Sequence, residues 1–217
     1  MTDTIDPDRL KMFSFGVFTQ LSGAVTAGMI HLGDKLGLYT AICSVVADAA
    51  GLDERWVREW AHNQAAAKII EVDTSVSPET FSLSPEGTAV LASPDHVAFG
   101  MGMFHRFPQT IGALEHMPES FRTGIGHDYD SHGCEGAVGI EKSFEPWMRH
   151  HLIDTVLPAL DGVVERLEAG ATVIDIGCGA GGAVLMMAER FPNSTFVGYD
   201  ISAHALDRAN ERLAESG

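Results

Sequence analysis

The stretch TVIDIGCGAGG, residues 172–182, decides how the second half of the chain folds. Its first five residues form a short apolar run, which predicts a β-strand, and the glycines after it predict a tight turn. Gly177, Gly179 and Gly182 spell Gly-x-Gly-x-x-Gly, while Asp175 ahead of the turn gives Asp-x-Gly-x-Gly-x-Gly. The stretch therefore fits two classes of nucleotide ligand, and the choice between them largely decides the function.

The residues after this turn predict a second strand-and-helix unit. The pattern indicates a helix over 183–191, a strand over 195–200 and a helix over 202–216, with Ser202 as the helix cap. Strand, helix, strand, helix is the opening of a doubly wound parallel sheet. In such a sheet the ligand lies beyond the carboxyl ends of the strands, at the glycine turn and the following helix N-terminus.

Two carboxylates distinguish the possible ligands. Asp200 ends the second strand 23 residues after Gly177 and can accept both hydroxyls of a ribose in either class. Asp175 would repel a pyrophosphate, but it would attract a ligand that carries an ammonium and a sulfonium. That ligand is S-adenosyl-L-methionine. An NAD-dependent enzyme remains a competing interpretation, which predicts binding of NAD.

The motif formed by Asp175, Gly177, Gly179 and Gly181 resembles the first motif of class I S-adenosylmethionine-dependent methyltransferases. Together with GLDERWVREW (51–60), YDSHGCEGAVGIEKSFEPW (129–147) and LPALDGVVERLEAGATVIDIGCGAGG (157–182), it is similar to the bacterial two-domain type with an N-terminal winged-helix dimerisation domain. The resemblance implies a cytoplasmic homodimer, joined through its N-terminal helices, that methylates a small organic acceptor. The cofactor-binding positions it implies are Asp175, Gly177, Cys178, Gly179, Gly181, Asp200 and Ile201.

The expected fold is a mainly α winged-helix domain followed by the first part of an α/β Rossmann-like methyltransferase domain. We expect residues 1–95 to form the winged-helix domain, 96–168 a helical linker and substrate lid, and 169–217 the cofactor-binding part. Because two parallel strands leave an unpaired edge and an uncovered face, we expect a fragment with half a cofactor pocket. The alternative is an acidic winged-helix regulatory or interaction protein with a vestigial nucleotide-binding fold.

The N-terminal residues predict a helix that is apolar on most sides. Apolar residues recur at steps of three and four from Leu10 to Val25, and further ones widen the stripe. Such a helix is either a core helix or a subunit interface, and the pattern leaves both open. The run from Phe13 to Leu32 is interrupted by polar residues and glycines, so we expect no membrane span.

The next residues predict a winged helix. The pattern indicates a helix, a short helix over 43–50, a turn at Gly51 and a longer helix capped by Asp53, followed by strands over 69–73 and 80–84. Such a module suggests DNA binding. Charge argues against it, because the chain carries a net charge of -16 and residues 1–100 hold 6 basic against 13 acidic residues.

The central region predicts helices around a loop. Ser84-Pro85 and Ser93-Pro94 are typical helix starts, and a helix is expected over residues 94–117. The glycine-rich stretch 119–139 is the best loop candidate, before a helical segment that stops at Gly170.

Catalytic residues are the least determined part of the sequence. His127, His132, His150 and His151 are weak candidates for a base, and no metal site is expected. Cys43, Cys134 and Cys178 are odd in number and lack C-x-x-C spacing, which favours a reducing cytoplasm. The charged residues Glu141, Lys142 and Glu145 are most simply a solvated helical face.

Overall fold

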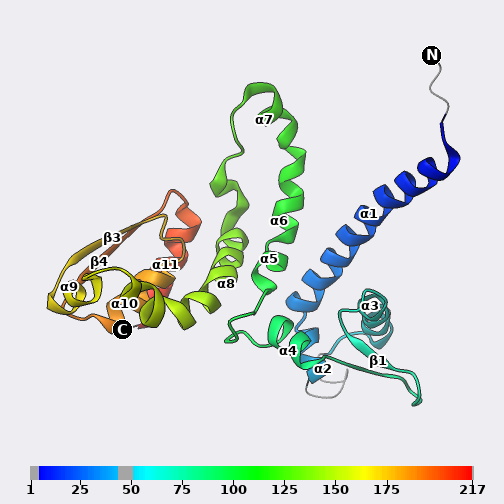
Figure 1. Ribbon diagram of the computed structural model, residues 1–217, viewed down its shortest axis with the longest axis horizontal. Helices are drawn as coiled ribbons and strands as arrows, with labels where there is room; N and C mark the ends of the chain where they lie inside the picture. Colours follow the sequence, from blue (N-terminus) through cyan, green and yellow to red (C-terminus); the bar gives the residue numbers. More distant parts are fainter. Residues whose placement is uncertain (1–4, 44–50, 217) are drawn as a thin grey trace. The chain divides into compact units, whose positions relative to one another are not determined.

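The computed structural model describes residues 5–43 and 51–216, which divide into two compact units, residues 1–84 and 85–217 (Figure 1). Each unit is described by itself. The short helix expected over residues 43–50 lies outside the described residues, apart from Cys43, the last residue of a helix.

The first unit has the winged-helix order of elements. It comprises α1 (Pro7–Lys35), α2 (Leu38–Cys43), α3 (Glu54–Ala66), β1 (Glu71–Asp73) and β2 (Thr80–Ser82). The Asp53 side chain caps α3 by accepting a hydrogen bond from the backbone N–H of Trp56 at 3.3 Å. The two strands pair antiparallel, with Val72 opposite Phe81. The predicted helix cap and hairpin are both present.

The core of this unit forms where α1, α2 and α3 meet. Trp60 and Tyr39 pack edge to face, with ring centroids 5.2 Å apart, and both are buried. Their rings fill the space in which a Cβ at Gly33 would lie, so α1 needs a glycine there. The Tyr39 hydroxyl donates to Gln64 at 2.6 Å, and burial, followed by the charge of Asp34, raises the pKa of this phenol.

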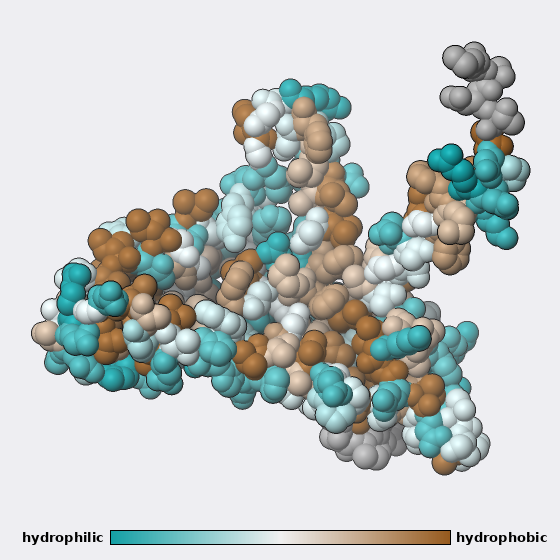
Figure 2. All heavy atoms as spheres, viewed as in Figure 1, coloured by the Kyte–Doolittle hydropathy of each residue, from teal (hydrophilic) through white to brown (hydrophobic). Residues whose placement is uncertain are grey.

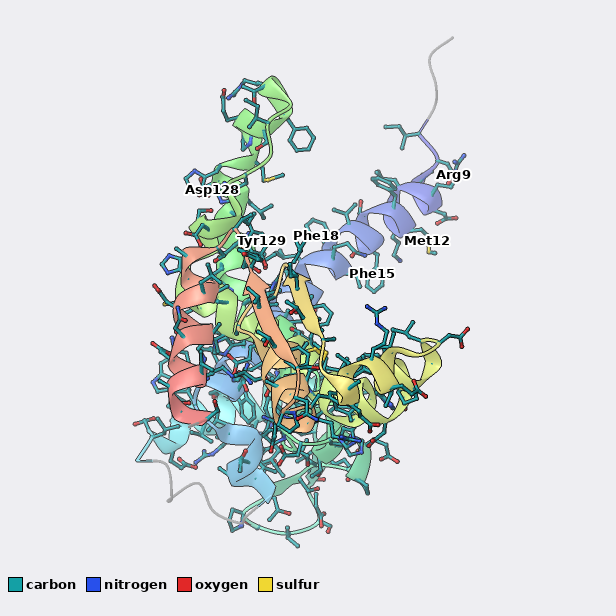
Figure 3. The ribbon with its side chains drawn as sticks, turned by 90° about the vertical axis from the view of Figure 1, so that its left-hand side faces the viewer. Arg9, Met12, Phe15, Phe18, Asp128 and Tyr129 are labelled. Atoms are coloured by element: carbon teal, nitrogen blue, oxygen red, sulfur yellow. The ribbon has the colours of Figure 1, made fainter. Side chains whose placement is uncertain are left out.

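Most of α1 is exposed within its own unit. The only buried side-chain positions in the helix are Ile30 and Gly33, near its end. Large apolar side chains stand out from the earlier turns, among them Met12, Phe15 and Phe18, and Phe15 is 75% exposed (Figure 3). The core-helix interpretation of this segment is therefore wrong for the single chain.

By length and composition alone, α1 is also long and apolar enough to cross a membrane. This differs from the expectation that its polar residues and glycines exclude a span. The difference arises because mean hydropathy averages over the helix, and the few polar residues are diluted by many apolar ones.

The first part of the second unit is a set of short helices leading to a long one. It comprises α4 (Pro85–Leu91), α5 (Met101–His105), α6 (Phe107–Gly112), η2 (Ala113–Glu115), α7 (Met117–Thr123), η3 (Tyr129–His132) and α8 (Gly133–His151). The helix start predicted at Pro85 is present. The single helix expected over 94–117 is wrong, because turns occupy 94–100 and α5 ends at His105, a few residues ahead of Pro108.

The glycine-rich stretch 119–139 is mostly helical, contrary to expectation. Only residues 124–128 lack helical structure, and α8 begins at Gly133. The reason is close packing, because a Cβ at Gly139 would lie 2.7 Å from the Arg106 Cβ, and one at Gly136 would lie 2.7 Å from the His132 Cβ. These glycines permit close approach on a helix and do not mark a loop.

The remaining elements form the predicted strand-helix units. A π-helical turn (Leu152–Val156) and a 3₁₀ turn (Leu157–Ala159) lead to α9 (Val163–Ala169), β3 (Thr172–Ile176), α10 (Gly182–Arg190), β4 (Thr195–Tyr199) and α11 (Ala203–Ser216). The helix α9 stops at Gly170, as predicted. Strands β3 and β4 pair in parallel, with Asp175 opposite Gly198.

One face of this two-stranded sheet is covered and the other is open. Leu157, Leu167, Met187 and Phe191 form a core against which Val173 packs from β3. On the opposite face the apolar side chains are exposed, and Ile176 is 86% accessible. Hydrophobic residues accordingly gather on the surface over β3 and β4 (Figure 2).

Candidate functional site

The glycine turn between β3 and α10 has a backbone that only glycine adopts easily. Gly177, Gly179 and Gly181 have φ angles of 84°, 55° and 75°. The N–H groups of Gly177 and Cys178 both donate to the carbonyl of Tyr199, at 2.7 and 3.0 Å. A Cβ at Gly177 or Gly179 would meet nothing within 4 Å, so open space lies in front of the turn.

Asp200 connects the turn to the end of β4. One carboxylate oxygen accepts from the N–H of Gly179 at 2.8 Å, and the other accepts from the N–H of Ser202 at 2.9 Å. Asp175 lies within β3 and is half-buried, whereas Ile201 is 86% exposed. The structure therefore gathers the two predicted carboxylates and the glycines at one end of the sheet.

Cys178 is the bulkiest side chain within the turn. A Cβ at Gly198 would lie 2.7 Å from its sulfur, so a glycine in β4 makes room for the thiol. Burial raises the pKa of the Cys178 thiol, and the charges of Asp200 and Asp175 raise it further. The side chain is therefore a protonated thiol at neutral pH.

A cleft adjoins this turn. It is lined by Arg106, Gln109, Tyr129, His132, Gly133, Gly136, Ala137, Ile140, Gly179, Ala180, Asp200, Ser202 and Ala205. One wall thus comes from the ends of β3 and β4, and the other comes from α5, α6, η3 and α8. Figure 3 marks Tyr129 on the segment that joins α7 to α8.

The four candidate histidines occupy different surroundings. His132 lines the cleft. His127 lies beside His132 and stacks on His116, with the ring centroids of His127 and His116 5.3 Å apart. One ring nitrogen of His127 lies 2.6 Å from the Ser131 hydroxyl. His150 contacts the carbonyl of Asp95 at 2.7 Å, and the His151 ring packs on Trp147. Among the four, His132 is the one that the structure brings to Gly179 and Asp200.

Asp130 joins the segment that carries His132 to the start of α11. Its carboxylate accepts a hydrogen bond from the Ser202 hydroxyl at 2.5 Å, and that hydroxyl also accepts from the N–H of Ala205 at 3.1 Å. The hydrogen bond from Ser202 is the main reason that the pKa of Asp130 is lowered. Of the two residues in this contact, only Ser202 was predictable, as a helix cap.

Comparison with known proteins identifies the two parts of the chain. Residues 167–217 match the family model of a methyltransferase domain, and residues 24–93 match that of an Rv2258c-like winged HTH domain. The chain joins a winged-helix domain to a methyltransferase domain. The expected fold class is confirmed.

Individual relatives agree with these domains. Over 66 residues, the chain is 38% identical to the release factor glutamine methyltransferase of Agrobacterium fabrum, which covers 30% of this chain and 22% of that protein. The fold of the chain is similar to that of mitomycin 7-O-methyltransferase, with a TM-score of 0.61 and 20% identity. The match covers 97% of this chain and 64% of that one. The fold is also similar to that of human N-acetylserotonin methyltransferase, solved in complex with SAM. The TM-score is 0.55, the identity is 14%, and the match covers 98% of this chain and 64% of that one. The chain thus spans less than two thirds of the length of these proteins.

The methyltransferase domain is tied to α8 by a charge network that the sequence analysis missed. Arg208 forms an ion pair with Glu141 at 2.9 Å, and Arg212 forms one with Glu145 at 2.8 Å. Arg212 also donates to the carbonyl of Ala180 in the glycine turn at 3.2 Å. The interpretation of Glu141 and Glu145 as a solvated face is wrong, since Glu145 is only 6% exposed.

A sequence signal for this network existed. Glu141 and Glu145 are four residues apart, as are Arg208 and Arg212, so each pair lies on one face of a helix. The hydrogen bond to Glu141 raises the pKa of Arg208. Within residues 5–43 and 51–216, no group of three histidine, cysteine or acidic side chains is arranged to hold a metal ion.

Proposed function

We propose that the chain belongs to an S-adenosylmethionine-dependent methyltransferase that acts in the cytoplasm on a small organic acceptor. One observation carries the proposal: Gly177 and Gly179 face open space at the same end of the sheet as Asp175 and Asp200. An anionic pocket of this kind favours a cationic nucleoside over a diphosphate. Cys134 and Cys178 are both free thiols, which supports a reducing compartment.

The residues present fit the cofactor. The glycines at 177 and 179 leave room for a ligand against the backbone, where a side chain would fill the space. Asp175 would face the charged methionine part, and the free lone pairs of Asp200 would accept the ribose hydroxyls. When bound, S-adenosylmethionine supplies an electrophilic methyl group: the acceptor forms a bond to its carbon as the carbon–sulfur bond breaks and its electron pair stays on sulfur.

The residues of this chain supply alignment and a proton acceptor. In-line displacement requires the acceptor to be held opposite the sulfur, so positioning is the main contribution of the protein. His132 lies in the cleft with Gly179 and Asp200. We assign it as the base that takes the proton of an acceptor hydroxyl, since histidine is the side chain most often used to accept a proton in catalysis.

Isothermal titration with S-adenosylhomocysteine and with NAD tests the proposal. We expect the chain to bind the nucleoside and not the dinucleotide. Asp200→Asn should weaken nucleoside binding about tenfold, since it replaces a charged acceptor. Asp207→Asn, which alters an exposed carboxylate of the same charge on α11, is the matched control and should bind normally. Binding of NAD with no binding of S-adenosylhomocysteine would refute the proposal.

The regulatory alternative is disfavoured by the methyltransferase domain and the methyltransferase relatives. The helix α3 adds a physical reason, because Arg58, one of its basic residues, already pairs with Glu54. We therefore expect no retention of duplex DNA at low salt, where phosphate contacts are strongest.

We further propose that the protein is a homodimer joined through α1. The support is the exposed apolar surface of that helix, since a soluble monomer rarely exposes so large an apolar stretch. Association would remove this surface from water, which is favourable by about 25 cal/mol per Å².

A further inference from the structure

The wall of the cleft opposite the glycine turn contains a cation without a counter-ion. Arg106 is half-buried, and within the described residues its guanidinium has no ion pair. Arg9, Arg55 and Arg166 also lack one there, but these three side chains are exposed to solvent. A half-buried charge without a partner is unfavourable, so Arg106 is a position where a ligand anion would be stabilising.

The packing of α5 against α8 holds Arg106 at the cleft. A Cβ at Gly139 would lie 2.7 Å from the Arg106 Cβ, and a Cβ at Gly102 would collide with the backbone of Ser143. Both helices therefore need a glycine where they cross. Arg106 follows directly after the last residue of α5, so its position is set by this close crossing.

Gln109 supplies a second group without a partner. Its side-chain oxygen is buried and has no hydrogen-bond partner within the described residues. Gln109 also lines the cleft, three residues after Arg106 and therefore on the same helical side. A buried acceptor without a donor costs about 1–3 kcal/mol, which a ligand hydroxyl would recover.

The surface between these groups and His132 is apolar. Ala137 and Ile140, which are three residues apart on α8, line the same cleft. The cleft therefore offers a cation, a hydrogen-bond acceptor and an imidazole around an apolar surface. A ligand that matches it carries an acid group, a hydroxyl and a small apolar body.

We infer that the methyl acceptor is a small organic hydroxy acid, whose carboxylate binds Arg106 and whose hydroxyl donates to Gln109 until its proton passes to His132. That the bound acid is a methyl acceptor rests on the proposed function, but the anion site itself does not. The chain carries a net charge of -16, so anions are repelled from its surface at long range. A dedicated arginine is then what lets an acid bind, and neutral analogues of the same shape lose that contact.

Equilibrium titration of the chain with matched ligands tests the inference. The probes are benzoate, 3-hydroxybenzoate and 4-hydroxybenzoate, each compared with its neutral amide, with and without S-adenosylhomocysteine. We expect at least one acid to bind about tenfold more tightly than its amide, the preference that a charge-assisted hydrogen bond gives. A hydroxybenzoate should also bind more tightly than benzoate, because only the former has a donor for Gln109.

Two variants of equal charge separate the site from the general field of the protein. Arg106→Gln should abolish the preference for the acid, whereas Arg166→Gln, on an exposed arginine of α9, should keep it. Circular dichroism of both variants checks that each is folded. Gln109→Leu should remove the advantage of the hydroxyl and leave the preference for the acid.

The possible failures are distinguishable. If no acid binds better than its amide, or if Arg106→Gln keeps the preference for the acid, the inference is wrong, whether or not S-adenosylhomocysteine binds. If the acids bind as expected and S-adenosylhomocysteine does not, the anion site stands and the proposed methyl transfer fails.

Discussion

The hydroxyl of Ser202 donates a hydrogen bond of 2.5 Å to Asp130, a residue 72 positions earlier in the chain. The backbone N–H of Ser202 donates in turn to Asp200, which accepts from Gly179. One line of hydrogen bonds therefore connects the segment that carries His132 to the glycine turn.

The stability that the Asp130–Ser202 hydrogen bond contributes should decrease at acidic pH. The hydrogen bond from Ser202 lowers the pKa of Asp130 in the folded chain, so its stabilisation is fully present above the unfolded value of about 3.9. It is lost as pH falls through the lowered folded value. We expect Asp130→Asn to be less stable than the unmodified chain at pH 6, with the difference shrinking as the pH falls below the unfolded value. Thermal unfolding of both proteins at a series of pH values measures this difference in stability.

Asp128→Asn is the control for that experiment, since it removes an exposed carboxylate two residues away. Its stability difference should stay small across the whole range. A pH-independent effect of Asp130→Asn would show that the carboxylate charge plays no part.

The pair formed by Arg212 and Glu145 should be costly to break. Glu145 is buried and, among the described residues, would keep only Arg149 as a partner, so Arg212→Met should lower the free energy of unfolding by about 1–3 kcal/mol. The double variant with Glu145→Gln should recover part of this loss, giving a coupling of about 1–3 kcal/mol. Denaturant unfolding of the four proteins measures the cycle.

Arg190→Met provides the comparison, because Arg190 pairs with Glu168 on the surface, where both side chains are about half exposed. Its cost should stay below about 1 kcal/mol. Equal losses for Arg190→Met and Arg212→Met would contradict the importance of burial.

Gly198 should tolerate no side chain. A Cβ there would lie 2.7 Å from the Cys178 sulfur and 3.0 Å from its Cβ. Gly198→Ala should therefore cost about 1–3 kcal/mol and weaken S-adenosylhomocysteine binding, because the turn must shift. By contrast, Gly16→Ala in α1 meets nothing within 4 Å and should be neutral or stabilising by about 0.5–1 kcal/mol. Thermal unfolding and titration of the two variants check both statements.

The two described free cysteines should differ in reactivity. Cys134 is exposed, whereas burial raises the pKa of Cys178 and lowers its thiolate fraction at neutral pH. Iodoacetamide at pH 7 should therefore modify Cys134 several-fold faster, as peptide mass spectrometry would record. Because Cys178 belongs to the glycine turn, S-adenosylhomocysteine should slow its modification and leave that of Cys134 unchanged. Equal protection of both residues would point to a general change in the chain.

Charge placed on α1 should dissociate the proposed dimer. Phe15 is exposed, and Phe15→Glu would bury a charge in the interface, so light scattering after size exclusion should give the mass of a monomer. Gln20→Glu adds the same charge at an exposed polar position of the helix and should remain a dimer. If the unmodified chain is already monomeric, the interface proposal fails.

The local pattern of the sequence sufficed for the glycine turn and the elements around it. Branched residues predicted β3, the caps Asp53 and Ser202 predicted helix starts, and the spacing of Gly177, Gly179 and Gly181 predicted the turn. These features depend on φ angles and on contacts between residues close in sequence, which the local sequence determines. The family resemblance rested on the same residues.

Packing between distant segments decided the rest. Gly139 indicated a loop by composition, yet it lies in α8, because a glycine there lets Arg106 and Gly102 come close. Glu145 was predicted to lie on a solvated face, and only the fold brings Arg212 to it. The cleft likewise joins Arg106 to Asp200, nearly a hundred residues later, because tertiary contacts and not neighbouring residues determine which side chains share a site.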